Sequence, residues 1–211
     1  MSPALRPEIR PRFALVGPTG TQHLVTAEQP HQFEELLDAM KKAGGALKRA
    51  DVPYLLGGGL ACWARGGPKT EHDVDFLVRP RDAECAHQTL ERVGLRIEVP
   101  PEGWLLKAYD GDVLIDLIFD PQGGPIDDET FDRAEELEVH AMRMKVAALE
   151  DVLSQKLLAL KEQEPDFSSV LELARALREQ VHWDDVRERT KESPFAKAYF
   201  TLLHELEILP A

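Results

Sequence analysis

The spacing of apolar residues changes character along the chain. Between Gln32 and Arg49 apolar residues recur every three or four positions, as on one face of a helix. Between Arg49 and residue 146 most of the apolar residues stand in short runs of the length of a strand. From Leu149 to His204 the spacing is helical again, with breaks near Glu164-Pro165, His182-Trp183 and Ser193-Pro194. The pattern predicts a helix, a region built around a sheet, and a group of helices at the C-terminal end.

The middle region alternates between strand-like and helix-like segments. The expected strands cover residues 53–56, 74–78, 95–99, 104–108, 113–119 and 137–146, and the expected helices 60–65 and 81–93. Asp110-Gly111 is typical of a tight turn between the fourth and fifth strands. Residues 1–30 carry weaker signals, a short strand at 13–16 and a turn at 17–20.

This order of elements predicts an α+β fold with a mixed sheet flanked by helices and a C-terminal helical bundle. We expect an N-terminal extension at residues 1–30, a sheet domain at 31–147 and a helical domain at 148–211.

Three aspartates stand in apolar surroundings where charge is costly to bury. Asp73 and Asp75 flank Val74 at the start of the run that continues as Phe76-Leu77-Val78, and Asp116 lies inside the run 113–119. Alternate residues of a strand share a face, so Asp73 and Asp75 project the same way, with α-carbons roughly 7 Å apart. If the strand of Asp116 lies beside them, the three carboxylates converge and repel one another unless a cation lies between them. Hard oxygen ligands of this kind suit Mg²⁺ or Mn²⁺.

A triple glycine, Gly57-Gly58-Gly59, lies between an expected strand and an expected helix, shortly before the aspartates. Glycine lets a backbone approach a ligand closely, and the N–H groups that open a helix favour an anion such as a triphosphate. Together the two features predict a phosphate site beside a metal site.

The segments Leu56-Gly57-Gly58-Gly59-Leu60-Ala61 and Thr70-Glu71-His72-Asp73-Val74-Asp75-Phe76-Leu77 resemble the signature of the polymerase-beta-type nucleotidyltransferase superfamily. The resemblance covers roughly residues 50–120 and includes antibiotic- and toxin-like members. It implies a metal-dependent transfer of a nucleoside monophosphate from a triphosphate such as ATP to a hydroxyl group.

The resemblance also implies roles for individual residues. Asp73, Asp75 and Asp116 would hold the metal ions, and Asp116 would also help to deprotonate the acceptor. Gly58, Gly59 and Thr70 would bind the nucleotide, and Lys156 would contact its triphosphate. Lys156 also fits a second interpretation, a lysine whose stem covers the core while its ammonium reaches solvent. Asp112 and Asp120, at the two ends of the run 113–119, are expected to be turn residues.

The acceptor is left open by the sequence. An antibiotic, a protein side chain and an RNA end all remain candidates. A different class of function is a catalytically silent nucleotide-binding module, or a regulatory module of a toxin–antitoxin type, with the same fold.

Composition narrows the partners further. The 211 residues carry a net charge of −13, which disfavours nonspecific binding to DNA. No apolar stretch approaches the roughly 20 residues that cross a bilayer, and the first residues lack the apolar segment of a signal peptide. The two cysteines, Cys62 and Cys85, are expected to be reduced thiols of a cytoplasmic protein, with a disulfide between them as the alternative.

Overall fold

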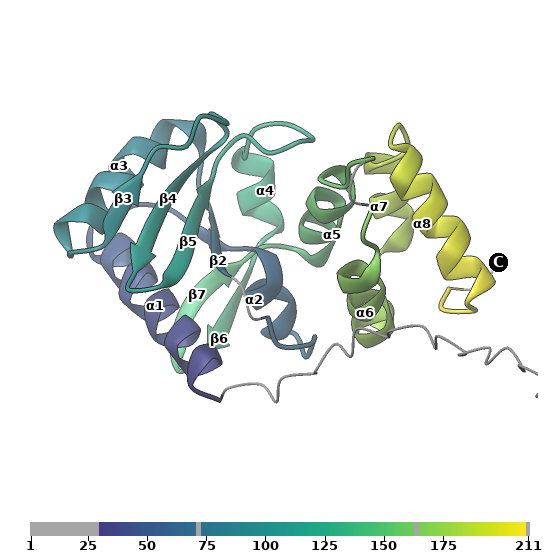
Figure 1. The fold of residues 1–211 in the computed structure, drawn as a ribbon, viewed down its shortest axis with the longest axis horizontal. Coiled ribbons are helices and arrows are strands. Elements are labelled where there is room, and N and C mark those ends of the chain that lie inside the picture. The colour runs from purple at the N-terminus through teal and green to yellow at the C-terminus, as the bar shows by residue number, and fades with distance from the viewer. Residues whose placement is uncertain (1–29, 71–72, 163–164, 210–211) are drawn as a thin grey trace, which may run out of the picture.

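The computed structural model describes residues 30–70, 73–162 and 165–209. The strand and turn expected at 13–20, and His72, lie outside the described residues. The described chain forms one seven-stranded mixed sheet with the order β3-β4-β5-β2-β1-β7-β6. Helices lie on both sides of the sheet, and a group of helices follows it (Figure 1). The predicted fold class is confirmed.

The strands are β1 (Leu55–Leu56), β2 (Asp73–Leu77), β3 (Arg96–Glu98), β4 (Leu105–Asp110), β5 (Val113–Ile118), β6 (Glu135–Val139) and β7 (Met142–Val146). The helices are α1 (Pro30–Arg49), α2 (Gly58–Trp63), α3 (Pro80–Arg92), α4 (Asp128–Arg133), α5 (Leu149–Leu158), α6 (Ser168–Leu177), α7 (Trp183–Arg189) and α8 (Pro194–Glu205), with a 3-10 turn η1 (Arg178–Gln180).

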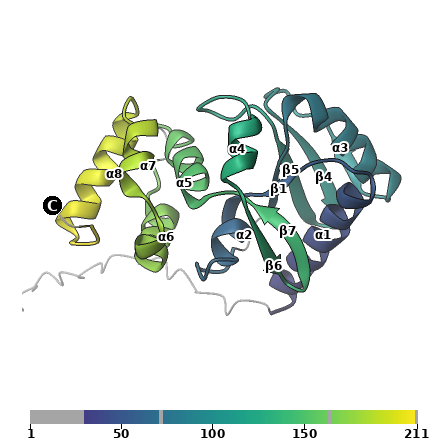
Figure 2. The same ribbon diagram turned by 180° about the vertical axis from the view of Figure 1, so that it is seen from behind.

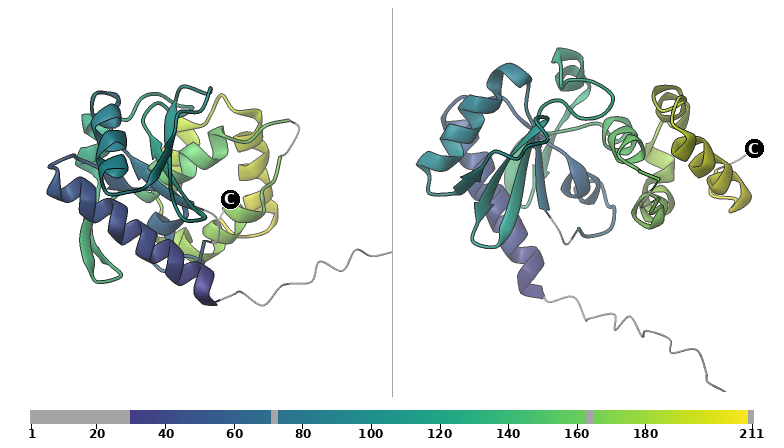
Figure 3. Two further views of the ribbon diagram at one scale, coloured as in Figure 1. Left: turned by 60° about the vertical axis from the view of Figure 1, so that its left-hand side comes forward. Right: turned by 45° about the horizontal axis from the view of Figure 1, so that its top comes forward.

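Helices α1 and α3 cover one face of the sheet, and α2 and the C-terminal helices lie on the opposite side (Figure 3, right). The apolar stripe of α1 is buried as its spacing predicts, with Met40, Ala43 and Leu47 fully enclosed. Below it, the ring of Phe76 on β2 meets that of Tyr54 edge to face at 5.0 Å. This core fixes which face of β2 is apolar, so the opposite face is left for the aspartates.

The β4–β5 hairpin forms at the predicted turn. Asp110 pairs with Val113, and Gly111 between them has a φ of +62°, which favours glycine. The register counted back from this turn places Lys107 opposite Asp116. The turn therefore determines what lies beside the third aspartate.

The middle region departs from the sequence analysis in two places, one wrong prediction and one element that was not predicted. The strand expected at 137–146 is a hairpin of two strands, β6 and β7, turned by His140 and Ala141 at φ values of +47° and +62°. Asn and Gly usually signal such a turn, and neither is present here. Helix α4 was not predicted, because it is only six residues long, although Asp127 caps it by accepting a 2.8 Å hydrogen bond from the Thr130 amide.

The C-terminal region consists of α5 to α8 (Figure 2), as the helical spacing from Leu149 onward predicts. Its internal packing centres on Tyr199, which is fully buried and donates a 2.6 Å hydrogen bond from its hydroxyl to the Val170 carbonyl. In the part of the chain that the structure describes, no helix is long and apolar enough to cross a membrane. Cys62 is buried and Cys85 exposed, and both are free thiols.

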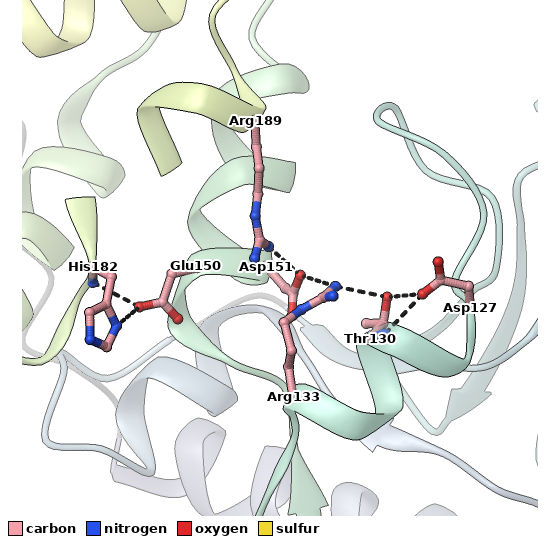
Figure 4. Close-up of polar contacts among 7 residues, drawn as sticks. All are labelled: Asp127, Thr130, Arg133, Glu150, Asp151, His182 and Arg189. Atoms are coloured by element: carbon pink, nitrogen blue, oxygen red, sulfur yellow. Dashed lines mark hydrogen bonds and ion pairs between the residues drawn. The ribbon is translucent and has the colours of Figure 1, made fainter. Parts of the chain in front are cut away.

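A buried carboxylate joins these helices to the sheet region. Asp151, near the start of α5, accepts two hydrogen bonds from Arg133 of α4, at 3.1 and 2.8 Å, and a third of 2.7 Å from Arg189 at the end of α7 (Figure 4). Arg133 also donates to the hydroxyl of Thr130, which in turn bonds the capping residue Asp127. One side chain therefore fixes α5 to a helix on either side of it.

Candidate metal and nucleotide site

Asp73, Asp75 and Asp116 converge on one face of the sheet. Strands β2 and β5 are parallel neighbours, and Asp75 lies directly opposite Asp116 in their register. Each of the three side chains offers a carboxylate oxygen, and these oxygens all lie within 4.8 Å of one another. Val74 and Phe76, which point to the other face, are fully buried. The alternation of β2 and its pairing with β5 thus produce the cluster that the sequence predicts.

The triple glycine lies against the second aspartate. Gly58 opens α2 with a φ of +53°, and a Cβ added there would lie 1.6 Å from the carboxylate oxygen Oδ2 of Asp75. A Cβ on Gly59 would lie 2.5 Å from the Thr70 side chain. No residue with a side chain fits at either position without moving its neighbour. The glycines therefore make room for the carboxylate of Asp75 and for Thr70.

The carboxylates are electrostatically destabilised as anions. Desolvation raises the pKa of Asp75 well above its usual value, and the charges of Asp73 and Asp116 raise it further, while Lys156 opposes them. Burial raises the pKa of Asp116 to about 6 against the opposing charge of Lys107. Both pKa shifts come first from burial of the carboxylates, and repulsion among the aspartates adds to it.

A divalent cation fits this arrangement. Asp116 is buried, and its oxygen Oδ1 has no hydrogen-bond partner among the described residues, which is costly unless another group satisfies it. Three carboxylates are the hard oxygen donors that Mg²⁺ and Mn²⁺ prefer. The identity of the donors and the unsatisfied oxygen are independent reasons to place a cation here.

The cluster opens into a cavity of about 510 Å³ between the sheet and α5. Of the residues predicted from the sequence, the three aspartates, Gly58 and Lys156 line this cavity together. Gly59 and Thr70 are not among its lining residues and pack against each other beside it. The structure thus brings five of the seven candidates to one cavity and places the other two, in contact with each other, outside its lining.

Several lining residues were not predicted. Asp120, interpreted from the sequence as a turn residue, lines the cavity, as do Trp104, Gln155 and Lys161. Lys107 of β4, which is not among the lining residues, was also not predicted, although it lies opposite Asp116. Counting back along the hairpin from the pair Asp110 and Val113 would have identified it. Trp104 and Asp120 carried no such signal, because they lie beyond the strand ends and reach the cavity only through the fold.

A mixed sheet with an Asp-x-Asp strand, a third aspartate on the adjacent strand and a glycine turn at the head of a short helix is the arrangement of the polymerase-beta-type nucleotidyltransferase superfamily. The family described as "Nucleotidyl transferase of unknown function (DUF2204)" matches residues 36–200. The chain belongs to this family.

Solved structures agree with this class. The solution structure of the antibiotic-resistance factor ANT(2'')-Ia has a TM-score of 0.58 and 15% identity, covering 82% of this chain and 98% of the other. The crystal structure of ANT(2")-Ia with adenylyl-2"-tobramycin gives 0.58 and 14%, covering 77% and 98%. At this identity the likeness establishes the fold. No curated protein matches the sequence.

Proposed function

We propose that the protein is a metal-dependent nucleotidyltransferase, which moves a nucleoside monophosphate from a nucleoside triphosphate to a hydroxyl group of an acceptor. One observation carries the proposal: three carboxylates from adjacent parallel strands, with oxygens within 4.8 Å of one another, line the same cavity as Gly58 and Lys156. Structural carboxylates in a core have cationic partners, whereas this cluster has an unsatisfied oxygen.

Asp73, Asp75 and Asp116 would hold Mg²⁺ or Mn²⁺. Such ions, when bound, neutralise charge on the phosphate oxygens and stabilise the attacking and leaving oxygens of a phosphoryl transfer. The other contributions are positioning, charge and acceptance of the hydroxyl proton, as is general for phosphoryl transfer.

The chain's own groups have distinct tasks in this proposal. Lys156, whose charge already acts on Asp75, supplies positive charge for the phosphates from the α5 side of the cavity. Gly58, which has no side chain, leaves the space next to the Asp75 carboxylate oxygen Oδ2 free. Asp116, which lies beside the other two carboxylates on the adjacent strand, would also accept the proton of the acceptor hydroxyl.

The acceptor class stays open between a small molecule, a protein side chain and an RNA end. The experiment is incubation with each α-³²P-labelled nucleoside triphosphate, Mg²⁺ or Mn²⁺, and fractions of a cell extract. We expect one fraction to take up label, and Asp73→Ala and Asp75→Ala to abolish the uptake. Metal-dependent nucleotide binding without transfer to any fraction would instead favour the catalytically silent module.

A further inference from the structure

The cavity has two chemically different ends, separated by the aspartates. Across the sheet, β4 lies next to β5, β5 next to β2, and β2 next to β1. Trp104 directly precedes β4, while Lys156 is on α5, which packs on α2, and α2 in turn packs on β2. Figure 1 shows this sequence of elements from β4 through β5 and β2 to α2 and α5. The carboxylates of β5 and β2 therefore lie between a tryptophan end and a lysine end.

Charge and polarity differ between these ends. Lys156 and Lys161 line the α5 end, and Trp104, Pro121 and Asp120 line the β4 end. A polyphosphate is attracted to the lysines and repelled by Asp120. The β4 end offers instead a flat aromatic surface.

Trp104 is an exposed aromatic side chain that lines the cavity. It is 38% exposed, and among the described residues only Val99 and Leu206 are other large apolar side chains with comparable or greater exposure, neither of which lines this cavity. Its backbone is held in place, because the Trp104 carbonyl accepts hydrogen bonds of 3.1 Å from the amides of Phe119 and Asp120. A large aromatic side chain on a fixed backbone, open to a cavity, is a typical platform for a planar ring.

We propose that the nucleobase of the incoming triphosphate stacks on Trp104; this inference rests on the proposed function. A nucleoside triphosphate carries, in order, its β- and γ-phosphates, the reacting α-phosphate, the ribose and the base. The packing of β4, β5, β2, α2 and α5 brings a tryptophan, the carboxylate cluster and lysines to the cavity in the matching order. The base is also the one planar, uncharged part of that substrate, and stacking on an aromatic side chain tolerates any base.

The test compares two ligands on the same variants. Isothermal titration calorimetry with Mg²⁺ would measure the affinity of α,β-methylene nucleoside triphosphates, which cannot transfer the nucleotide, and of inorganic tripolyphosphate, which has no base. Trp104→Ala is expected to weaken the nucleotide analogue by about tenfold or more, the range of a single base–aromatic stack, and to leave tripolyphosphate unchanged. Trp104→Phe, which keeps a ring, should retain most of the affinity.

Trp183→Phe is the matched control, because Trp183 lies in the helical region, where its indole donates a hydrogen bond to the Arg178 carbonyl. The nucleotide affinity of this variant should equal that of the wild type. Equal nucleotide affinity in wild type and Trp104→Ala would overturn the inference while leaving the proposed function intact. So would an equal loss for tripolyphosphate, since the effect would then not depend on a base. A wild-type protein that binds no nucleotide analogue in the presence of Mg²⁺ would overturn the proposed function itself.

Discussion

Asp116 and Asp151 are both buried aspartates, 9% and 6% exposed, and they differ in what surrounds their oxygens. Asp151 accepts three hydrogen bonds from two arginines. Asp116 has an oxygen without a partner and two further carboxylates beside it. Burial alone therefore does not identify a functional acid. The difference is that Asp151 is neutralised by two arginines of the fold, whereas Asp116 keeps an oxygen without a partner, which supports the proposal that a cation binds there.

Removing a carboxylate from the cluster should have the largest effect. Asp75→Asn is expected to lower nucleotidyl transfer by roughly 10²–10³-fold or more, because metal-assisted charge stabilisation contributes several kcal/mol to such reactions. Its metal-free stability should stay equal to or exceed that of the wild type, since the substitution relieves repulsion within the cluster. Label transfer and urea unfolding in EDTA measure the two quantities. A large loss of stability together with activity would mean that the cluster is structural.

The second largest loss of nucleotidyl transfer is expected when the Asp75 carboxylate is crowded but keeps its charge. Gly58→Ala would place a Cβ against the Asp75 carboxylate, and a displacement of about 1 Å in a catalytic group can cost about 10²-fold in rate. Gly66→Ala is the matched control, because Gly66 also has a positive φ, +90°, but no atom lies within 4 Å of the added Cβ. Both variants should lose some stability from backbone strain. Only Gly58→Ala should lose more nucleotidyl transfer activity than its loss of stability accounts for. Label transfer and urea unfolding measure the two quantities.

Substitution of Asp151 should lower the stability of the protein, whereas substitution within the cluster should lower its activity. Asp151→Ala leaves Arg133 and Arg189 unpaired; because these arginines are about one-third exposed, we expect a loss of about 2–4 kcal/mol in unfolding free energy, at or below the range for a broken buried pair. Asp128→Ala, which removes an exposed partner of Arg79 and Arg81, should lower the unfolding free energy far less, because solvent screens a surface ion pair. Urea unfolding measures both. Equal losses of unfolding free energy in the two variants would contradict the claim that the buried Asp151 contributes more to stability than a surface carboxylate.

The smallest effect is a pH dependence of the metal-free protein. Burial raises the pKa of Asp116 from 3.8 to about 6, so between these values the folded state holds a proton that the unfolded state has released. Stability should therefore be highest at the acid end of this window and fall by about 1–3 kcal/mol as the pH rises through it. Unfolding in EDTA at pH 5 and pH 7.5 measures the change.

The comparison with Asp116→Asn separates this effect from the general repulsion of an acidic protein. The variant has no carboxylate at this position, so its stability should vary less with pH than that of the wild type. Equal slopes in the two proteins would contradict the assigned pKa shift.

The sequence predicts the aspartate cluster because the period of a strand and the cost of buried charge are local properties. The shared face of Asp73 and Asp75 follows from strand spacing, whereas the role of Gly58 rests on its place before the aspartates and on the family resemblance. Lys107 was not predicted, although counting back along the hairpin would have found it. Trp104 and Asp120 could not be found in this way, because the loops that bring them to the cavity are set by the packing of β4, β5 and α5. Asp151 also escapes sequence analysis, since its two arginines lie 18 residues before it and 38 residues after it. The β6–β7 turn was missed because His140 and Ala141 are atypical for their backbone conformation.

The most direct test of the central claim is binding of Mn²⁺, followed by electron paramagnetic resonance in the presence of a nonhydrolysable nucleoside triphosphate. The wild type is predicted to bind the ion. Asp75→Asn and Asp116→Asn should lose that binding, and Asp128→Asn, a surface substitution, should keep it. Binding of Mn²⁺ by the two cluster variants with the affinity of the wild type would contradict the claim that this cluster is a metal site.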